Sequence, residues 1–446
     1  MTIGSKAEVC IIGAGLAGSE AAWQIARRGH RVDLFEMRPV RTTAAHKTSD
    51  FAELVCSNTF KSDSLDTATG LLKEEMRRCD SLILRIADQT RIPAGTALAV
   101  DRERFAAEVT QALEAQPLVQ IHRREMEEIP KQGIVIVATG PLVSEALSSD
   151  IARFIGRGYL YFFDAVSPIV EADSIDLSKV FRASRYGKGD EDYLNCPMDE
   201  TTYERFIDAI LAASTAPRHE FDATGFFEGC LPIEEMARRG RDTLRFGPLK
   251  PVGLVDPKTG RRPHAVVQLR QDNAAAEHFN IVGFQNSLRW GEQERIFRMI
   301  PGLEQASFVR LGMIHRNSYI NAPATLLPTF QARRRTDLFF AGQISGVEGY
   351  LESAASGLMA GINAARLVES HPALSFPSTT ALGCLGRYIS TADVKDYQPT
   401  NMAFGLLPPL ATPLRDKKAR RAMLVRRALD DLGTFRATLD PVGTPR

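Results

Sequence analysis

The sequence has few cysteines, and none of them stands in a metal-binding or redox motif. Six cysteines are spread over 446 residues, and no two of them are separated by the two residues typical of disulfide reductases and zinc sites. We therefore expect neither a bound metal nor a redox disulfide. Scattered thiols in this number are typical of a reducing compartment, and we predict a cytoplasmic protein.

Long hydrophobic runs are also missing. The first apolar stretch, from Val9 to Gly18, follows Glu8 and is interrupted by glycines, which argues against a signal peptide and against a membrane span. No later stretch reaches the roughly 20 apolar residues that cross a bilayer, so we expect no membrane association. With 44% hydrophobic and 24% charged residues, the composition is that of a globular protein of about two or three domains.

The chain has almost no excess of charge of either sign. Its formal net charge is +1, so total charge does not indicate a nucleic-acid partner. Basic residues nevertheless gather locally, either to contact RNA or as ordinary solvated helix faces. The clusters are Arg238, Arg239 and Arg241; Arg333 to Arg335; and Arg415, Lys417, Lys418, Arg420, Arg421, Arg426 and Arg427. The last cluster lies on a predicted helix whose buried side would comprise Leu414, Ala422, Met423, Val425, Leu429 and Leu432.

What the sequence does contain is a glycine motif near its start. EVCIIGAGLAGSEAAWQIARRGHRVDLFEMR predicts a strand, a glycine-rich turn, a helix and a second strand that ends at Glu36. This order is the dinucleotide-binding fingerprint. Its first glycine permits the tight turn, the second lets the backbone approach the pyrophosphate, and the third allows close packing of helix and strand. The acidic residue accepts a hydrogen bond from a ribose hydroxyl. The predicted cofactor contacts are Gly13, Ala14, Gly15, Leu16, Ala17, Gly18 and Glu36.

Two distant segments indicate which dinucleotide is bound. IVIVATGP, from Ile134, predicts a buried strand that ends in Ala-Thr-Gly, and LFFAGQISGVEGYLESAASGLMAGINAA, from Leu338, predicts a strand, a glycine-bearing loop and a helix of small residues. The arrangement resembles that of glutathione-reductase-like flavoproteins, which implies an α/β Rossmann domain that binds FAD. Further contacts would come from Thr139, Gly140, Gly342, Gln343 and Gly346. Without a second glycine fingerprint, NADH or NADPH would bind only transiently.

The middle of the chain has a different pattern. YLYFFDAVSPIV and PHAVVQLRQDN predict strands, and TTYERFIDAILAA and EQERIFRMI predict amphipathic helices. We predict an inserted α+β substrate domain at residues 151–302. The FAD-binding domain would then consist of residues 1–150 and 303–446, and its second part would end in the basic helix.

One cysteine stands where a helix is predicted to begin. In FFEGCLPIEEMARRG, Cys230 precedes a Leu-Pro pair, and Pro232 suits a first helical turn. A free cysteine is often simply buried. The positive end of a helix, however, favours a reactive thiolate. This segment alone leaves both interpretations open.

Longer blocks extend over nearly the whole chain. They include ELVCSNTFKSD, DYLNCPMDETTYERF, FFEGCLPIEEMARRGRDTLRFGPLKPVGL, NIVGFQNSLRWGEQERIFRMIPGLE and FFAGQISGVEGYLESAASG. Together they resemble the folate- and FAD-dependent tRNA (uracil-5-)-methyltransferase family. The resemblance implies conversion of the T-loop uridine of tRNA to 5-methyluridine, with 5,10-methylenetetrahydrofolate as carbon donor and NAD(P)H reducing FAD. It also implies the T arm of tRNA and folate as partners, with no obligatory protein partner.

The resemblance points to Cys230 and Cys56 as catalytic residues. Carbon 5 of uracil is a poor nucleophile, and a thiolate that adds to carbon 6 gives an enolate that can attack a methylene donor. A base must then remove the carbon-5 proton. Under this hypothesis Cys230 adds to the ring, or lies closest to it, and Cys56 takes or relays a proton near the flavin. A second route, in which flavin N5 first captures the methylene group, leaves Cys56 as the more important base. The sequence does not choose between the routes. Packing roles are predicted for Cys10, Cys79, Cys196 and Cys384.

Other functions fit part of the pattern. A related flavoenzyme that modifies the tRNA wobble uridine shares the fingerprint and the use of folate, but its chain is substantially longer. A flavin-bearing RNA-binding protein would bind tRNA without folate-dependent turnover. A small-molecule flavin oxidoreductase is disfavoured because the sequence has neither a redox cysteine pair nor a second dinucleotide fingerprint.

Overall fold

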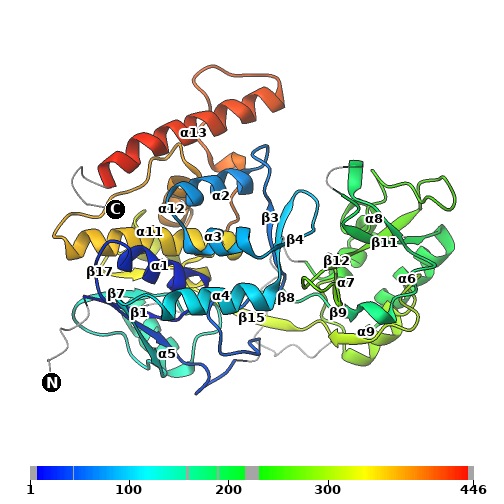
Figure 1. Cartoon of the computed structure of the whole chain (residues 1–446), viewed down its shortest axis with the longest axis horizontal. Coiled ribbons are helices and arrows are strands. Elements are labelled where there is room, and N and C mark those ends of the chain that lie inside the picture. The colour runs from blue at the N-terminus through cyan, green and yellow to red at the C-terminus, as the bar shows by residue number, and fades with distance from the viewer. Residues whose placement is uncertain (1–7, 44, 157–159, 188–189, 216–230, 440–446) are drawn as a thin grey trace.

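The computed structural model describes residues 8–43, 45–156, 160–187, 190–215 and 231–439 (Figure 1). A six-stranded sheet forms the centre of its larger part, with strand order β16-β17-β7-β1-β2-β6. All neighbouring strands are parallel except β16 and β17. The strands are β1 Val9–Ile12, β2 Val32–Glu36, β6 Val119–Arg123, β7 Ile134–Val137, β16 Gln331–Ala332 and β17 Arg335–Phe340. The α/β fold and the strands predicted near the three glycine-bearing segments are confirmed.

Helices cover this sheet, and two of them pack unusually closely. A Cβ atom added to Gly357 of α11 (Tyr350–Val368) would lie 2.1 Å from the Ala17 carbonyl oxygen of α1 (Leu16–Ala26). The helix of small residues predicted from the sequence is therefore needed for this contact. The other helices of the larger part are α2 Ala68–Arg78, α3 Leu82–Gln89, α4 Arg102–Glu114, α5 Glu145–Ile155, α10 Ala322–Thr325, α12 Ala381–Thr391 and α13 Lys417–Leu439.

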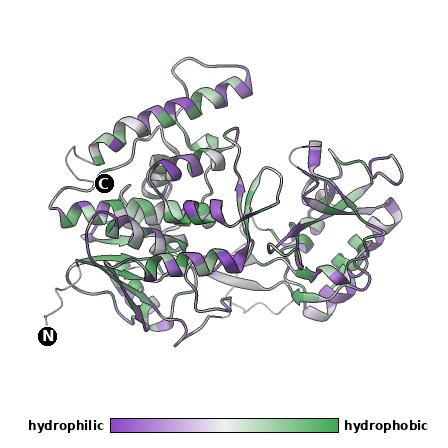
Figure 2. Ribbon diagram, in the orientation of Figure 1, coloured by the Kyte–Doolittle hydropathy of each residue, from purple (hydrophilic) through white to green (hydrophobic). Residues whose placement is uncertain are grey.

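The smaller part, on the right of Figure 1, has its own sheet and its own core. Its strand order is β10-β11-β12-β13-β9-β14, with antiparallel neighbours throughout. Figure 2 shows hydrophobic residues gathered inside both parts. The strands are β9 Ile169–Glu171, β10 Phe181–Arg182, β11 Tyr193–Met198, β12 Ala265–Gln271, β13 His278–Ile281 and β14 Phe308–Arg310. The helices are α6 Glu200–Ala212, α7 Ile233–Arg238, α8 Thr243–Phe246 and α9 Trp290–Phe297.

Two further small sheets lie where the parts meet. Strands β8 (Leu160–Ala165) and β15 (Ile314–Tyr319) pair with each other where the chain passes from the larger part to the smaller part and back. Strands β3 (Thr59–Ser62), β5 (Ala97–Val100) and β4 (Arg91–Ile92) form a three-stranded sheet on the side of the larger part that faces the smaller one (Figure 1). The domain boundaries at 150 and 302 stay a prediction. Strand β14 of the smaller sheet lies beyond the second boundary.

The C-terminal helix α13 lies at the top of the larger part, against α2 (Figure 1). Its buried side was predicted only in part. Val425 and Leu432 are buried as expected, whereas Ala422 and Met423 are exposed. The remaining buried residues, Leu424, Ala428 and Leu439, complete a stripe at helical spacing. Within the described ranges, every helix is too short or too polar to span a membrane.

Candidate active site

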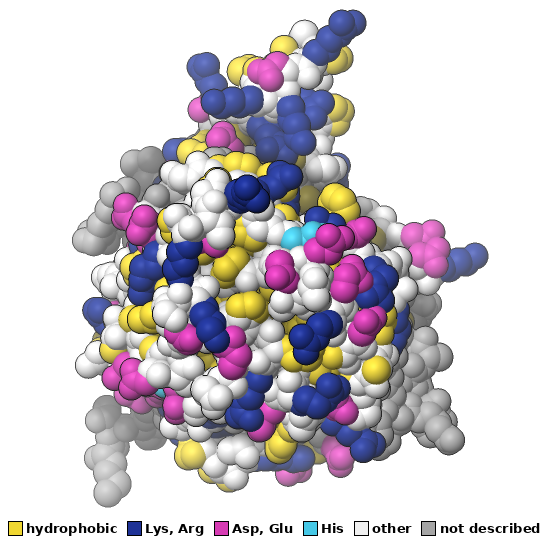
Figure 3. Space-filling view, turned by 90° about the vertical axis from the view of Figure 1, so that its right-hand side faces the viewer, with side chains coloured by type: hydrophobic (Ala, Val, Ile, Leu, Met, Phe, Trp, Pro, Cys, Tyr) yellow, Lys and Arg dark blue, Asp and Glu magenta, His cyan; other side chains and the backbone are white. Residues whose placement is uncertain are grey.

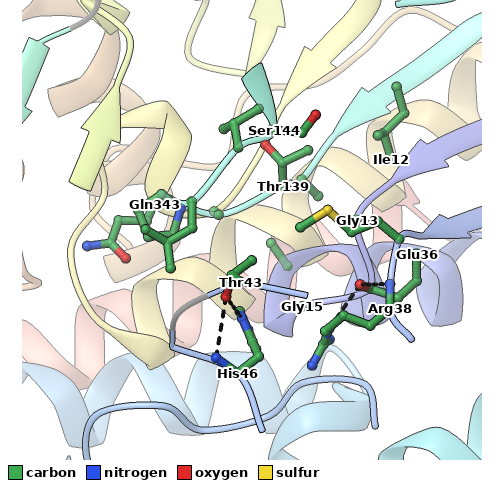
Figure 4. Close-up of a pocket in the computed structure, with 18 of the residues that line it drawn as sticks. Ile12, Gly13, Gly15, Glu36, Arg38, Thr43, His46, Thr139, Ser144 and Gln343 are labelled. Carbon is green, nitrogen blue, oxygen red and sulfur yellow. Dashed lines mark hydrogen bonds and ion pairs between the residues drawn. The ribbon is translucent and has the colours of Figure 1, made fainter. Parts of the chain in front are cut away.

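A cavity opens at the carboxyl ends of β1, β2 and β7, the edge at which open parallel sheets bind ligands (Figure 4). It contains about 1080 Å³ of space between protein atoms, including solvent at its mouth. Most of the predicted cofactor residues line it: Gly13, Gly15, Leu16, Ala17, Glu36, Thr139, Gly140, Gly342 and Gln343. Three others do not line it, namely Ala14, Gly18 and Gly346.

The three fingerprint glycines have different surroundings. Gly13 adopts φ +100°, and a Cβ atom there would lie 2.6 Å from the Ala138 carbonyl oxygen. A Cβ atom on Gly18 would lie 1.8 Å from the Gly13 carbonyl oxygen. Around Gly15, by contrast, no atom lies within 4 Å of an added Cβ. The first and third glycines therefore serve the packing of the turn, and the second leaves space in which a ligand can approach the backbone.

Glu36 is held at the cavity as a charged carboxylate. Its Oε2 accepts a hydrogen bond from the Ala14 backbone N–H at 3.0 Å, and its Oε1 accepts one from Arg38 Nε at 2.9 Å. Burial by itself would raise the Glu36 pKa, but the hydrogen bonds and charge of Arg38 outweigh burial, and the pKa is lowered. Arg38 also pairs with Glu53 at 3.0 Å. Arg38 was not predicted from the sequence as part of the site, although it follows Glu36 by two positions.

Two observations favour a polar or anionic ligand in this cavity, as the expected FAD is. The Thr139 Oγ1 atom is buried and has no hydrogen-bond partner among the described residues. Such orphaned polar atoms are rare unless a ligand or water supplies the partner. In addition, Tyr350 and Ser353, at the positive N-terminal end of α11, line the same cavity, where a helix end favours an anionic or hydrogen-bond-accepting group.

Cys56 lies in a loop beside this cavity, and two side chains, Tyr350 and Arg310, form hydrogen bonds with the backbone of this loop. Tyr350 Oη accepts hydrogen bonds from the backbone N–H groups of Cys56 at 2.6 Å and Ser57 at 3.1 Å. Arg310, on β14, donates to the carbonyl oxygens of Val55 at 2.8 Å and Cys56 at 3.0 Å. Val55 and Tyr350 line the cavity, and Cys56, next to Val55 in the chain, is not among the lining residues. Both parts of the molecule therefore fix the position of this cysteine.

Two more arginines bind the same loop. Arg102, at the start of α4, donates to the Leu54 carbonyl oxygen and forms an ion pair with Asp272 at 2.9 Å. Arg270, on β12, donates to Asn58 Oδ1 at 3.0 Å and to Ser57 Oγ at 2.9 Å. None of the residues Arg102, Arg270, Arg310 and Tyr350 was predicted from the sequence to lie at this loop. No local motif marks them, because they meet only in the fold.

The second proposed catalytic cysteine, Cys230, lies outside the described residues. Helix α7 begins at Ile233, with Pro232 immediately before it, and the role of Cys230 stays a prediction. Cys79, Cys196 and Cys384 are buried and Cys10 is half-buried, as their predicted packing roles require. Burial raises the pKa of Cys10 and Cys79 to about 12 and that of Cys384 to about 11. In the described part of the chain, no cluster of side chains suits a metal ion.

The basic clusters differ in how far their charges are already paired. In the first, Arg238 pairs with Glu235 at 2.7 Å, and Arg241 pairs with Glu204 and with Asp208. In the second, Arg335 pairs with Asp337 at 2.8 Å.

The start of α13 carries a third group, here called the basic patch: Lys417, Lys418, Arg420 and Arg421. None of the four forms an ion pair with a described residue. Figure 3 shows lysine and arginine side chains gathered on the projecting top of the face that it displays, the level at which α13 lies in Figure 1. In the second cluster, Arg333 and Arg334 also form no ion pair with a described residue, so the basic patch holds four such cations against two.

Comparison with known proteins places this site in a family. Residues 8–372 match the family described as glucose inhibited division protein A. The chain is 58% identical over 431 residues to methylenetetrahydrofolate--tRNA-(uracil-5-)-methyltransferase TrmFO of Pelotomaculum thermopropionicum, covering 97% of this chain and 99% of the relative. It is 57% identical over 423 residues to the protein of that name from Enterococcus faecalis, covering 95% and 97%. The solved structure of Aquifex aeolicus GidA has a TM-score of 0.70 at 19% identity over 98% of this chain and 77% of that chain, which shows a common fold. The chain therefore belongs to the glucose inhibited division protein A family and, within it, to the TrmFO group.

Proposed function

We propose that the protein methylates carbon 5 of a uridine in tRNA, with 5,10-methylenetetrahydrofolate as carbon donor and FAD as redox cofactor. The observation that carries this proposal is the 58% identity, over 97% of the chain, to a relative named for that reaction. The cavity supports it, because its glycine turn, its fixed carboxylate and the orphaned Thr139 hydroxyl fit a flavin dinucleotide. We further propose that the protein acts in the cytoplasm on the T-loop uridine.

The residues divide the work as follows in this proposal. The backbone at Gly15, the Glu36 carboxylate and the Thr139 hydroxyl hold the cofactor. Bound FAD supplies the electrons that turn the transferred methylene group into a methyl group, and NADH or NADPH, bound transiently, restores them. Cys230 adds to the uracil ring or lies closest to it, and Cys56, fixed beside the cavity, takes or relays a proton.

Binding of tRNA requires positive charge near phosphate groups. We propose that the basic patch on α13 contributes these contacts, because its cations form no ion pair with a described side chain. The cluster at Arg238 and Arg241, also predicted to contact tRNA, is a weaker candidate because carboxylates already bind both side chains.

The decisive experiment combines the purified flavoprotein, an unmodified tRNA transcript, methylenetetrahydrofolate labelled in its one-carbon unit, and NADPH or NADH. Mass spectrometry of the tRNA nucleosides should detect labelled 5-methyluridine, and omission of folate should abolish it. A transcript in which cytidine replaces the T-loop uridine should gain no label. Flavin reduction and tRNA binding without labelled nucleoside would instead favour an RNA-binding protein.

The cysteine roles have their own matched test. Cys56→Ala and Cys230→Ala should each lower turnover at least tenfold with FAD still bound. Cys10→Ala, at a half-buried thiol of raised pKa, should leave turnover unchanged. Normal turnover in both of the first two variants would show that neither thiol is catalytic.

A further inference from the structure

Three arginines converge on the Cys56 loop with more positive charge than nearby carboxylates neutralise. They come from three elements: Arg102 from α4, Arg270 from β12 and Arg310 from β14. Among the described residues, Asp272 is the carboxylate that pairs with this group, through Arg102 at 2.9 Å. Three guanidinium groups thus face one carboxylate.

This excess charge is largely removed from water. Arg270 is 6% exposed, and the Arg102 side chain is 13% exposed. The Arg310 Nε atom is buried and has no hydrogen-bond partner in the described part of the chain. Burial lowers the pKa of Arg270 and of Arg310, and repulsion from Arg102 lowers both further. Because buried charges are costly unless an opposite charge lies nearby, the cluster requires an anion.

Among the ionisable groups around the cluster, one is a strong candidate for this anion. Besides Asp272, the groups whose negative charge would act on these arginines are Cys56, Tyr350 and Tyr193. Burial raises the pKa of both tyrosines above the ordinary value, so they are neutral near pH 7. A thiolate at Cys56 would attract all three arginines, and Arg310 donates to the Cys56 carbonyl oxygen.

We propose that Arg102, Arg270 and Arg310 hold Cys56 in its thiolate form and are positioning residues for the reaction. Neighbouring cations are the usual means by which proteins stabilise a thiolate. This inference rests on the proposed function for its chemical use: the thiolate sulfur accepts the carbon-5 proton, so that an S–H bond forms, the C–H bond breaks and its electron pair stays with the ring. Two of the three charges come from the smaller sheet, which therefore takes part in preparing the thiol.

The test measures the alkylation of individual cysteines against pH in the FAD-bound enzyme, without tRNA or folate. Iodoacetamide reacts with the thiolate form, and peptide mass spectrometry resolves Cys56 from every other cysteine. In the unmodified chain, Cys56 should reach half of its maximal rate clearly below pH 8.5, about the value of an ordinary thiol. Cys10, Cys79 and Cys384 should stay unreactive there, since burial raises the pKa of each to about 11 or 12.

Substitutions at Arg310 then test whether this arginine lowers the midpoint for Cys56. Arg310→Met should raise the midpoint for Cys56 by about one pH unit, which is roughly a tenfold slower reaction at pH values well below the midpoint. Arg310→Lys should keep the midpoint close to that of the unmodified enzyme, because lysine keeps the positive charge. The control is Arg298→Met, which removes an exposed arginine that donates to the Ala306 carbonyl oxygen of the same part; it should leave the midpoint unchanged. A loop that merely loosens would change the rate at all pH values without moving the midpoint.

Three outcomes would overturn the inference. The first is a midpoint at or above pH 8.5 in the unmodified enzyme. The second is equal midpoints in the Arg310→Met and Arg298→Met variants. The third is a raised KM for folate with an unchanged midpoint, which would assign the positive charge to the carboxylates of the co-substrate. Because the alkylation needs no substrate, a low midpoint without formation of 5-methyluridine would contradict the proposed function and leave the thiolate assignment standing.

Discussion

The glycine turn permits a prediction in which two similar substitutions have opposite consequences. Gly15→Ala and Gly18→Ala each add one methyl group to the same turn. At Gly18 the new carbon would lie 1.8 Å from the Gly13 carbonyl oxygen, whereas at Gly15 no protein atom lies within 4 Å. The first substitution therefore damages the fold, and the second obstructs only what enters the cavity.

The expected magnitudes follow from these distances. Contacts between carbon and oxygen below about 3 Å require α1 to move, and overpacking of this kind costs about 1–3 kcal/mol. Alanine regains only about 0.5–1 kcal/mol of helix propensity at Gly18. At Gly15, φ is −70°, which alanine adopts freely, so the stability of the FAD-free protein should change by less than about 1 kcal/mol. The affinity for FAD should nevertheless fall at least tenfold, which is about 1.4 kcal/mol.

Denaturant unfolding of the FAD-free proteins and titration with FAD separate the two effects. Gly18→Ala should lower the unfolding free energy, and Gly15→Ala should lower only the affinity. The reasoning would be refuted if Gly15→Ala bound FAD as tightly as the unmodified chain, because the open space at Gly15 would then not be the approach of the ligand. A fully stable Gly18→Ala protein would refute the close packing of the turn.

Three further predictions concern other parts of the molecule. Tyr350→Phe removes the acceptor of two backbone N–H groups, and each N–H group left without a partner costs about 1–3 kcal/mol when buried. Turnover should fall at least tenfold with FAD content unchanged. The control Tyr388→Phe, which removes a more exposed hydrogen bond, should have normal turnover. Reversing the charges of the basic patch should weaken tRNA binding and reduce its salt slope by roughly 3, whereas Arg241→Gln, at an already paired cation, should leave the slope unchanged. Burial lowers the pKa of Lys73 to about 8. Between about pH 8 and 10.5 the unfolded chain therefore binds more protons than the folded chain does. Across this window the unfolding free energy should rise with pH by up to about 3 kcal/mol relative to that of the Lys73→Met variant.

The sequence predicted the cofactor cavity well because the information there is local. Gly13, Gly15, Gly18 and Glu36 lie within one strand–helix–strand unit, whose geometry is fixed by short connections. The Ala-Thr-Gly segment and the strand near Leu338 are distant in sequence, but parallel pairing brings them to the same sheet edge. In these segments, residue spacing alone was enough to predict that most of these residues lie at one cavity; their contacts with a cofactor stay a prediction.

The surroundings of Cys56 were not predictable in the same way. Tyr350 is 294 positions from Cys56 and Arg310 is 254 positions away, and neither stands in a motif that names a partner. The same limit applies to charge. Arg241 belongs to a basic run in the sequence, but Glu204 and Asp208 of α6 pair with it in space. The exposed positions of Ala422 and Met423 likewise depend on the way α13 packs against α2, which periodicity alone does not specify.

The two halves of the candidate site also have different structural sources. Every predicted cofactor contact that lines the cavity comes from the larger part. The Cys56 loop is held from both parts, by Tyr350 and Arg102 of the larger part and by two arginines of the smaller sheet, Arg270 and Arg310. Cofactor binding and the preparation of Cys56 should therefore be separable. Substitutions in β12 and β14 can alter the thiol with the flavin in place, and substitutions in the glycine turn can remove the flavin with the loop intact. A smaller part that served only to hold substrate would not show this separation, because loss of its arginines would then change substrate affinity and leave the chemistry of Cys56 unaltered.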